Sequence, residues 1–208
     1  MSTGRIRAQF RRVGAPAAAL PLTSGIAVAA IGVVMAGSWT ATQTAVAVTW
    51  LSQMFSIAVG ITAVVALTGD PVIELHESTP TSFRAAQLIR GAIVLTVSVL
   101  AVFAMFAPLH ARRVWPRDVG WVDVLGPVSS TTFIVAVALA AAAFSRSAST
   151  TSIAVIAGWM FVSLMWEPYV GVLAVRCGGL FVMAAGFAVM AALRLGDAEE
   201  NISKAVTT

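Results

Sequence analysis

The stretch 91-GAIVLTVSVLAVFAMFAP-108 decides the fold, because none of its eighteen residues is charged. A helix that crosses the hydrocarbon core of a bilayer needs about 20 predominantly apolar residues. The whole chain has the same character, since 59% of its 208 residues are hydrophobic and only 11% are charged. A soluble domain carries about 25% charged residues. The sequence therefore predicts an all-α integral membrane protein.

Five further apolar runs accompany this stretch. Two precede it and three follow it, at about 18–39, 45–68, 122–144, 152–166 and 172–195. The polar connection 38-SWTATQT-44 is short, so the first two runs are expected to form an antiparallel hairpin. The sequence predicts a polytopic protein of about six transmembrane helices, with one membrane domain over 15–195 and a cytoplasmic tail over 196–208.

The basic and aromatic residues predict the orientation of these helices. With both termini in the cytoplasm, the inner segments hold nine Lys and Arg residues and the outer segments hold three, in line with the positive-inside rule. Tryptophan collects at membrane interfaces. Five of the six tryptophans fall at expected outer ends, and Trp159 is the exception. Twelve arginines against one lysine, with abundant alanine, indicate a GC-rich, actinobacterial type of coding sequence, so the expected location is a bacterial plasma membrane.

The N-terminal segment 1-MSTGRIRAQFRRVG-14 is basic and has one apolar helical face. Ile6, Phe10 and Val13 recur on that face. This pattern is typical of an amphipathic helix in the headgroup layer, where basic side chains meet anionic lipid. The alternative is a basic stretch that only keeps the N-terminus inside. The membrane-surface residues would be Arg5, Arg7, Arg11 and Arg12.

The segment 69-GDPVIELHESTPTSFRAAQLIRG-91 is the most polar part of the interior of the chain. Asp70 followed by Pro71 predicts a helix start, and a second start follows at Thr79 and Pro80. The face between them is acidic and carries Asp70, Glu74, Glu77 and Ser78. Because the inner leaflet is anionic, this acidic face favours a soluble cytoplasmic partner. A solvated helical connector is the alternative.

This segment resembles the cytoplasmic coupling segment of the permease subunits of type-2 ATP-binding-cassette exporters. The matching positions are Asp70, Pro71, Glu74, Leu75, Thr79, Pro80 and Arg84. The run 141-AAAFSRSASTTSIAVIAGWM-160 is similar to the second cytoplasmic turn of that family. The basic N-terminal helix, the six spans and a broken hairpin before the last span also match. The outer loops of this chain are shorter than is common in the family, which places an extracellular gate in doubt.

The resemblance implies a mechanical role. A separate ATPase subunit, carrying ATP and Mg²⁺, would hold the short helix in a cleft, with His76 and Glu77 also in the contact, and Glu74 and Glu77 as the main orienting residues. Closure of that cleft would tilt the spans of this chain and of a second permease subunit, identical or different. An apolar or amphipathic substrate would then move outward by alternating access. This chain itself would hold no cofactor.

The sequence lacks the residues that are typical of several other function classes. The chain has no GxxxxGK[ST] phosphate loop. The two histidines, His76 and His110, are expected on opposite sides of the membrane, so no metal site is predicted. No catalytic residue is predicted either, and the chain is not expected to be an enzyme. The net charge of +4 comes from scattered arginines, whereas nucleic-acid binding favours clustered basic residues.

Two other readings stay open. Small residues in the first span (Ala27, Ala29, Gly32, Ala36 and Gly37) would allow close helix approach. They suit either packing within the bundle or docking of a substrate-binding membrane component of an energy-coupling-factor importer. A membrane scaffold without a transport role is the third class.

Two charged residues flank the shortest apolar run. Glu167 follows this run, and Arg176 comes four residues into the next run. Charged side chains in lipid are costly, so the two could be paired in a re-entrant hairpin at the outer face or could line a polar cavity. Alternatively, both could extend to the outer headgroups.

Overall fold

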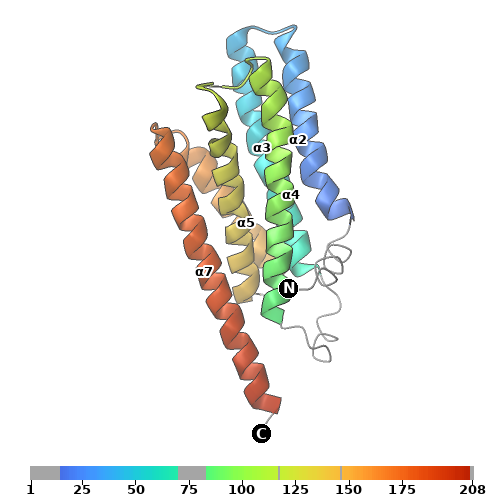
Figure 1. The fold of residues 1–208 in the computed structure, drawn as a ribbon, viewed down its shortest axis with the longest axis vertical. Helices are drawn as coiled ribbons and strands as arrows, with labels where there is room; N and C mark the ends of the chain where they lie inside the picture. The colour runs from blue at the N-terminus through green and yellow to red at the C-terminus, as the bar shows by residue number, and fades with distance from the viewer. Residues whose placement is uncertain (1–14, 70–82, 117, 146, 207–208) are drawn as a thin grey trace.

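The computed structural model of the chain describes residues 15–69, 83–116, 118–145 and 147–206. Within these ranges, six helices are long and apolar enough to cross a membrane (Figure 1). They are α2 (Ala15–Ala36), α3 (Ala41–Thr68), α4 (Phe83–Ala111), α5 (Leu125–Ser145) after the 3₁₀ turn η2 (Trp121–Val124), α6 (Ala148–Met160) continued by the π-helix η3 (Phe161–Trp166), and α7 (Leu173–Val206). The chain is thus an all-α, multi-pass membrane protein, as the sequence predicts.

The helices run alternately between two ends of the bundle (Figure 1). The hairpin end holds the connection between α2 and α3, and the terminal end holds the start of α2 and the end of α7. At the hairpin end, Thr40 caps α3 with a reciprocal pair of hydrogen bonds. The Gln43 N–H donates to Thr40 Oγ1 at 3.3 Å, and the Thr40 N–H donates to Gln43 Oε1 at 3.2 Å. This capping box satisfies backbone donors that the first turn leaves free.

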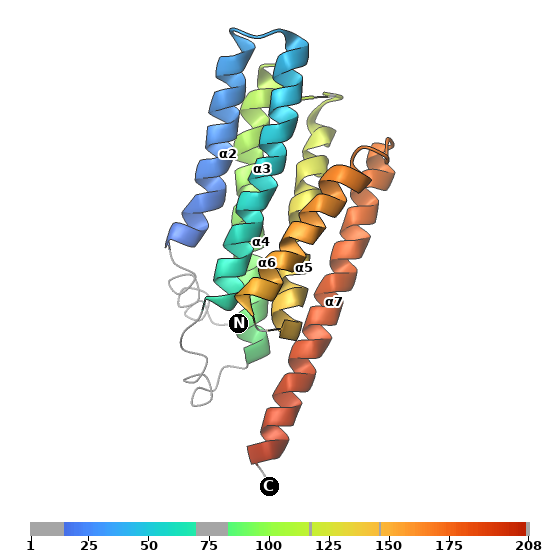
Figure 2. The same cartoon turned by 180° about the vertical axis from the view of Figure 1, so that it is seen from behind.

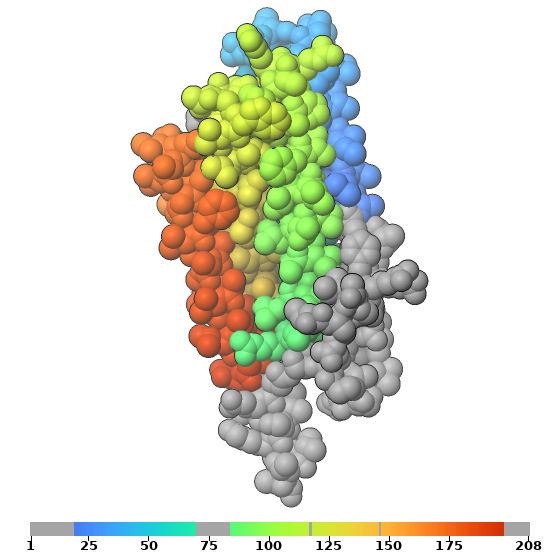
Figure 3. Space-filling model, in the orientation of Figure 1, coloured from blue at the N-terminus to red at the C-terminus, as the bar shows by residue number. Residues whose placement is uncertain are grey.

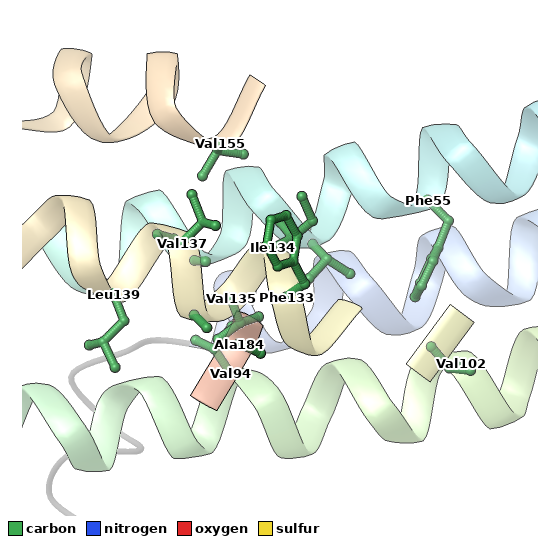
Figure 4. Packing of buried hydrophobic residues seen from close by; sticks show 14 of the residues in the cluster. Phe55, Val94, Val102, Phe133, Ile134, Val135, Val137, Leu139, Val155 and Ala184 are labelled. Atoms are coloured by element: carbon green, nitrogen blue, oxygen red, sulfur yellow. The ribbon is translucent and has the colours of Figure 1, made fainter. Parts of the chain in front are cut away.

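Helix α5 is the centre of the bundle. It is the most buried of the spans, and α3, α4, α6 and α7 pack around it. On the face shown in Figure 3 it is visible only as a narrow strip between α4 and α7. Figure 4 shows its buried side chains together with those of four neighbouring helices: Phe133, Ile134 and Val137 of α5, Val94 and Val102 of α4, Phe55 of α3, Val155 of α6 and Ala184 of α7. Three buried alanines in its last two turns, Ala140, Ala142 and Ala143, let the neighbours approach.

Helix α2 packs on α3 and α4 at glycine positions. A Cβ atom at Gly25 would lie 2.6 Å from the carbonyl oxygen of Ala101, and one at Gly32 would lie 2.6 Å from Leu109 Cδ2. Ala29 is also buried, whereas Ala27 and the residues at 36–37 are exposed. Part of the small-residue patch therefore serves packing inside the bundle.

The helices extend beyond the apolar runs that reveal them. Helix α4 continues past Pro108 to Ala111, and α7 continues past Leu195 to Val206. The predicted tail therefore begins as a continuation of α7. Apolarity marks the part of a helix that lies in lipid, but the helix ends only where its backbone hydrogen bonds end.

Candidate functional site

A partly open cavity of about 240 Å³, lined by polar and apolar side chains, lies between α3, α5 and the α6–η3 segment. Its space comes from the course of α6, which crosses obliquely from α3 toward the start of α7 (Figure 2). At the α3 side of this crossing, Val155 of α6 packs against Gly60 of α3. At the other side, Trp166 Nε1 donates to the Arg176 carbonyl oxygen at 2.9 Å. The divergence of η3 from α3 leaves a space that polar side chains line.

The α3 wall is a polar stripe. Thr49, Ser52, Gln53 and Ser56 line the cavity, at positions i, i+3, i+4 and i+7 of one helical face. Ser56 lies fifteen residues beyond Ala41, which is about 22 Å along the axis at 1.5 Å per residue. Because α3 has 28 residues, the stripe reaches about the middle of the helix.

The hydroxyl groups of this wall bond to their own helix. Ser52 Oγ donates to the Thr49 carbonyl oxygen at 2.8 Å, and Ser56 Oγ donates to that of Ser52 at 3.3 Å. Thr49 Oγ1 donates to the carbonyl oxygen of Ala45 at 2.9 Å. The Oε1 atom of Gln53 is buried and has no hydrogen-bond partner among the described residues. The wall therefore offers the cavity hydroxyl lone pairs together with the Gln53 amide, which has both an acceptor oxygen and N–H donors.

The second wall is the start of α5. Asp123 of η2 is only 5% exposed, and its Oδ2 accepts a hydrogen bond of 2.6 Å from the Val119 N–H. One turn later, Ser129 Oγ donates to the Gly126 carbonyl oxygen at 2.8 Å. Ser130 Oγ lies 3.1 Å from the same carbonyl oxygen and 3.2 Å from Glu167 Oε1. This wall thus adds a buried carboxylate and two more hydroxyl oxygens.

The third wall is η3 and the turn after it. The Glu167 N–H donates to the Val162 carbonyl oxygen at 2.9 Å, five residues back, which is the π-helical bond. The wide turn brings Ser163 and Glu167 onto the cavity. Trp159 of α6 also lines the cavity, and its Nε1 donates to the Gln53 carbonyl oxygen at 3.1 Å. Such π-turns are frequent at functional sites.

Arg176 of α7 completes the cavity. It is half-buried, and its guanidinium lies beside Gly126, where an added Cβ would be 4.0 Å from one terminal nitrogen. Within the described ranges, no hydrogen bond or ion pair joins this guanidinium to another residue. The site therefore combines two carboxylates, a guanidinium and a surface of oxygen acceptors.

An aromatic cluster covers the cavity toward the hairpin end. Trp115 lines the cavity and packs edge-on against Phe106, with ring centroids 5.1 Å apart. The ring of His110 stacks on Phe106 at 5.2 Å and meets Trp121 at 4.9 Å. His110 Nδ1 is 2.9 Å from the carboxylate of Asp118. These contacts hold the loop after α4 over the site.

The sequence-predicted residues fall in three groups. Glu167 and Arg176 both line the cavity. The segment 148–166 is helical throughout and is long and apolar enough to cross a membrane. Arg84 lies in the first turn of α4 and is exposed. One of its guanidinium nitrogens is 3.1 Å from the place where a Cβ of Gly196 in α7 would lie. The remaining predicted residues lie outside the described ranges: Arg5, Arg7, Arg11, Arg12, Asp70, Pro71, Glu74, Leu75, His76, Glu77, Thr79 and Pro80.

Sequence reasoning missed the α3 stripe and Asp123. A signal for the stripe exists, because its polar residues recur on one face of an otherwise apolar run. Trp159 is a second signal, since it is the one tryptophan away from an expected outer end. No comparable signal marks Asp123, which lies at the very start of the fourth apolar run, next to the polar loop that precedes it. In the described ranges, no group of three or more His, Cys, Asp or Glu residues could hold a metal ion.

Comparison with protein-family models, with curated proteins and with solved structures gives no match to this chain.

Proposed function

We propose that this chain is the membrane-spanning permease subunit of an ATP-binding-cassette exporter and that the polar cavity is its substrate site. The charged cavity inside the bundle is the observation that carries the proposal. Asp123 lies in η2 before α5, Glu167 directly follows η3, and Arg176 is in the first turn of α7, so three charged side chains from the ends of three spans line one cavity. A transport site gives a reason for Asp123, Glu167 and Arg176 to converge there, whereas a scaffold needs none of them.

The route from the ATPase subunit to the cavity would run through the segment 70–82. The two helices that flank this segment are joined by a hydrogen bond, in which Gln87 Nε2 of α4 donates to the Leu67 carbonyl oxygen of α3 at 3.2 Å. Arg90 is buried one turn further along α4, at 4% exposure. A push on the segment would therefore move α3 and α4 together. Because α3 forms one wall of the cavity, such a movement would change the site.

The site suits an amphipathic substrate. Its polar group would occupy the cavity, and its apolar part would extend among the side chains that face lipid. Both termini would lie in the cytoplasm of a bacterial cell, with this chain in the plasma membrane beside a second permease subunit. ATP and Mg²⁺ would be held by the ATPase partner. Coupling requires that the partner bind the two states of the permease with different affinities.

Co-purification tests this proposal. The chain is expressed with its genomic neighbours, purified in mild detergent, and compared with a variant in which residues 70–78 are scrambled. We expect a nucleotide-hydrolysing subunit to co-elute in stoichiometric amount with the parent chain and to be lost with the variant. In reconstituted vesicles, Glu74→Arg should reduce transport per ATP hydrolysed while leaving membrane insertion intact.

A parent chain that elutes alone, or a scrambled variant that keeps its partner, contradicts the proposal. Unchanged coupling in Glu74→Arg removes Glu74 from the contact.

The substrate-binding component of an importer is a second candidate. One observation favours it: the cavity lies between helices of a single bundle, among α3, α5 and the α6–η3 segment, so one copy of the chain has a place for a ligand. Uptake of substrate into cells with the scaffold subunits present, in place of export, would decide for this candidate.

A further inference from the structure

The cavity contains both a donor side and an acceptor side. The donor side is Arg176, whose planar guanidinium carries five N–H groups. The acceptor side is formed by the hydroxyl groups of the α3 stripe, because each hydroxyl hydrogen already points to a backbone carbonyl oxygen. Gln53 adds an amide with one acceptor oxygen, which is buried and unpartnered among the described residues, and two N–H donors. A buried acceptor without a partner is destabilising. A ligand that donates to this wall would recover that free energy.

The charges of the cavity narrow the ligand further. A simple anion at Arg176 would lie near the carboxylates of Asp123 and Glu167, which repel it. A simple cation would be attracted by the carboxylates of Asp123 and Glu167 but would offer the guanidinium of Arg176 no anionic group. A ligand that carries both charges can contact both sides of the cavity at once.

We infer that the cavity binds a small zwitterion with a protonated amine and a carboxylate or phosphate group. The anionic group lies on the guanidinium of Arg176, where a bidentate contact is available. The ammonium donates to Ser52, Gln53 and Ser56. The volume of about 240 Å³ holds about eight water molecules at 30 Å³ each, which limits the polar group of the ligand to the size of a short amino acid or a lipid headgroup.

This inference deepens the proposed function and rests on the cavity as its substrate site. Two sources supply the same chemistry, a free zwitterion and the ethanolamine headgroup of a phospholipid. Binding is measured on the isolated chain and needs no ATPase, so the inference and the ABC partnership fail separately.

The first experiment needs no variant. The chain is placed in phosphatidylglycerol nanodiscs and titrated calorimetrically with glycerophosphoethanolamine and γ-aminobutyrate. The matched controls are ethanolamine and dimethyl phosphate, which carry one charge each, and glycerophosphocholine, which lacks N–H donors. We expect at least one zwitterion with a primary amine to bind at least tenfold more tightly than all three controls.

Variants then locate the ligand. Arg176→Gln and Gln53→Leu should each weaken zwitterion binding at least tenfold, whereas Arg112→Gln, an exposed arginine at the same end, should leave it unchanged. In mixed nanodiscs, native mass spectrometry reports whether phosphatidylethanolamine is retained over phosphatidylcholine. Retention that depends on Arg176 assigns the lipid source, and binding of free probes alone assigns a soluble ligand. Zwitterions that bind no better than the controls, with no lipid retained, would overturn the inference.

Discussion

Gly25 of α2 shows how one absent side chain sets a helix–helix distance. Its Cα faces the backbone of α4, and a Cβ there would lie 2.6 Å from the Ala101 carbonyl oxygen. A backbone oxygen within a helix cannot swing aside, so α2 itself would have to move. Gly178 of α7 is the opposite case, because nothing lies within 4 Å of an added Cβ. The same residue type thus has a packing role at one position and none at the other.

Gly25→Ala is expected to destabilise the protein by about 1–3 kcal/mol, the usual cost of overpacking. Gly178→Ala adds the same methyl group into open space and removes the backbone freedom of glycine, so it should be neutral or stabilising by up to about 1 kcal/mol. Thermal unfolding in one detergent, followed by circular dichroism, compares the two. Equal melting temperatures for both variants would show that α2 does not pack closely on α4.

His110 combines a ring contact and a polar contact. Its ring packs on Phe106 and Trp121, and its Nδ1 lies 2.9 Å from Asp118. His110→Ala loses both kinds of contact, and two aromatic pairs alone are worth about 1–3 kcal/mol. His110→Phe keeps the rings and loses only the polar contact, worth about 0.5–1.5 kcal/mol. Melting temperatures should therefore fall in the order parent, His110→Phe, His110→Ala. A larger loss in His110→Phe would assign the stability to the polar pair.

At the scale of elements, η3 decides what lines the cavity. A π-turn contains one residue more than the α-helical turn that it replaces, and the helix on either side keeps its register. The extra residue widens the turn beside Ser163 and Glu167, both of which face the cavity. Leu164 and Ile156 are both exposed, at 49% and 55%, on the outside of this segment. Leu164 lies in the π-helical segment η3, whereas Ile156 lies in the α-helical segment α6, so the two positions form a matched pair.

Deletion of Leu164 should be tolerated, because the π-turn can close to an α-helical turn and leave the flanking registers unchanged. Deletion of Ile156 should disrupt packing, because residues after it rotate by about 100° relative to those before it. Val155 precedes the deleted position and Gly158 follows it, and both are buried. After the deletion they cannot both face the bundle. Monodispersity on size exclusion and the melting temperature report the outcome. Equal tolerance of both deletions would argue that η3 has no special role in register.

At the scale of the whole molecule, an even number of crossings places α2's start and α7's end on one side. Figure 1 shows both at the terminal end. The basic residues predict that this side is the cytoplasm. The orientation in turn places the aromatic cover of the cavity, at Trp115 and Phe106, toward the outside. The direction in which a ligand enters depends on this assignment.

Cysteine labelling checks the orientation. In a Cys177→Ser background, Ser38→Cys at the hairpin end should react with an impermeant maleimide on intact cells. Ala148→Cys at the terminal end should react only after the membrane is permeabilised. Both positions are exposed, so accessibility differs only by side. Labelling of Ala148→Cys on intact cells, with protection of Ser38→Cys, would reverse the orientation.

The six crossings follow from the sequence alone. Each apolar run must leave water and must satisfy its own backbone hydrogen bonds in lipid, so it forms a helix whatever its neighbours are. The bounds were less predictable, because helix ends such as Val206 depend on polar turns that lie outside lipid. The pairing of α2 with α4 through Gly25 and Gly32 could be suspected from small residues, but the partner helix could not be named.

The cavity was decided by the tertiary structure. Gln53, Asp123, Glu167 and Arg176 are separated by up to 123 residues along the chain, and no local pattern links them. They meet because α6 crosses obliquely and η3 turns its polar side inward. The crossing depends on contacts such as Gly60 with Val155, which exist only once α3 and α6 are packed. Partition into the membrane is a property of each run, whereas a polar site inside the membrane is a property of how the runs pack.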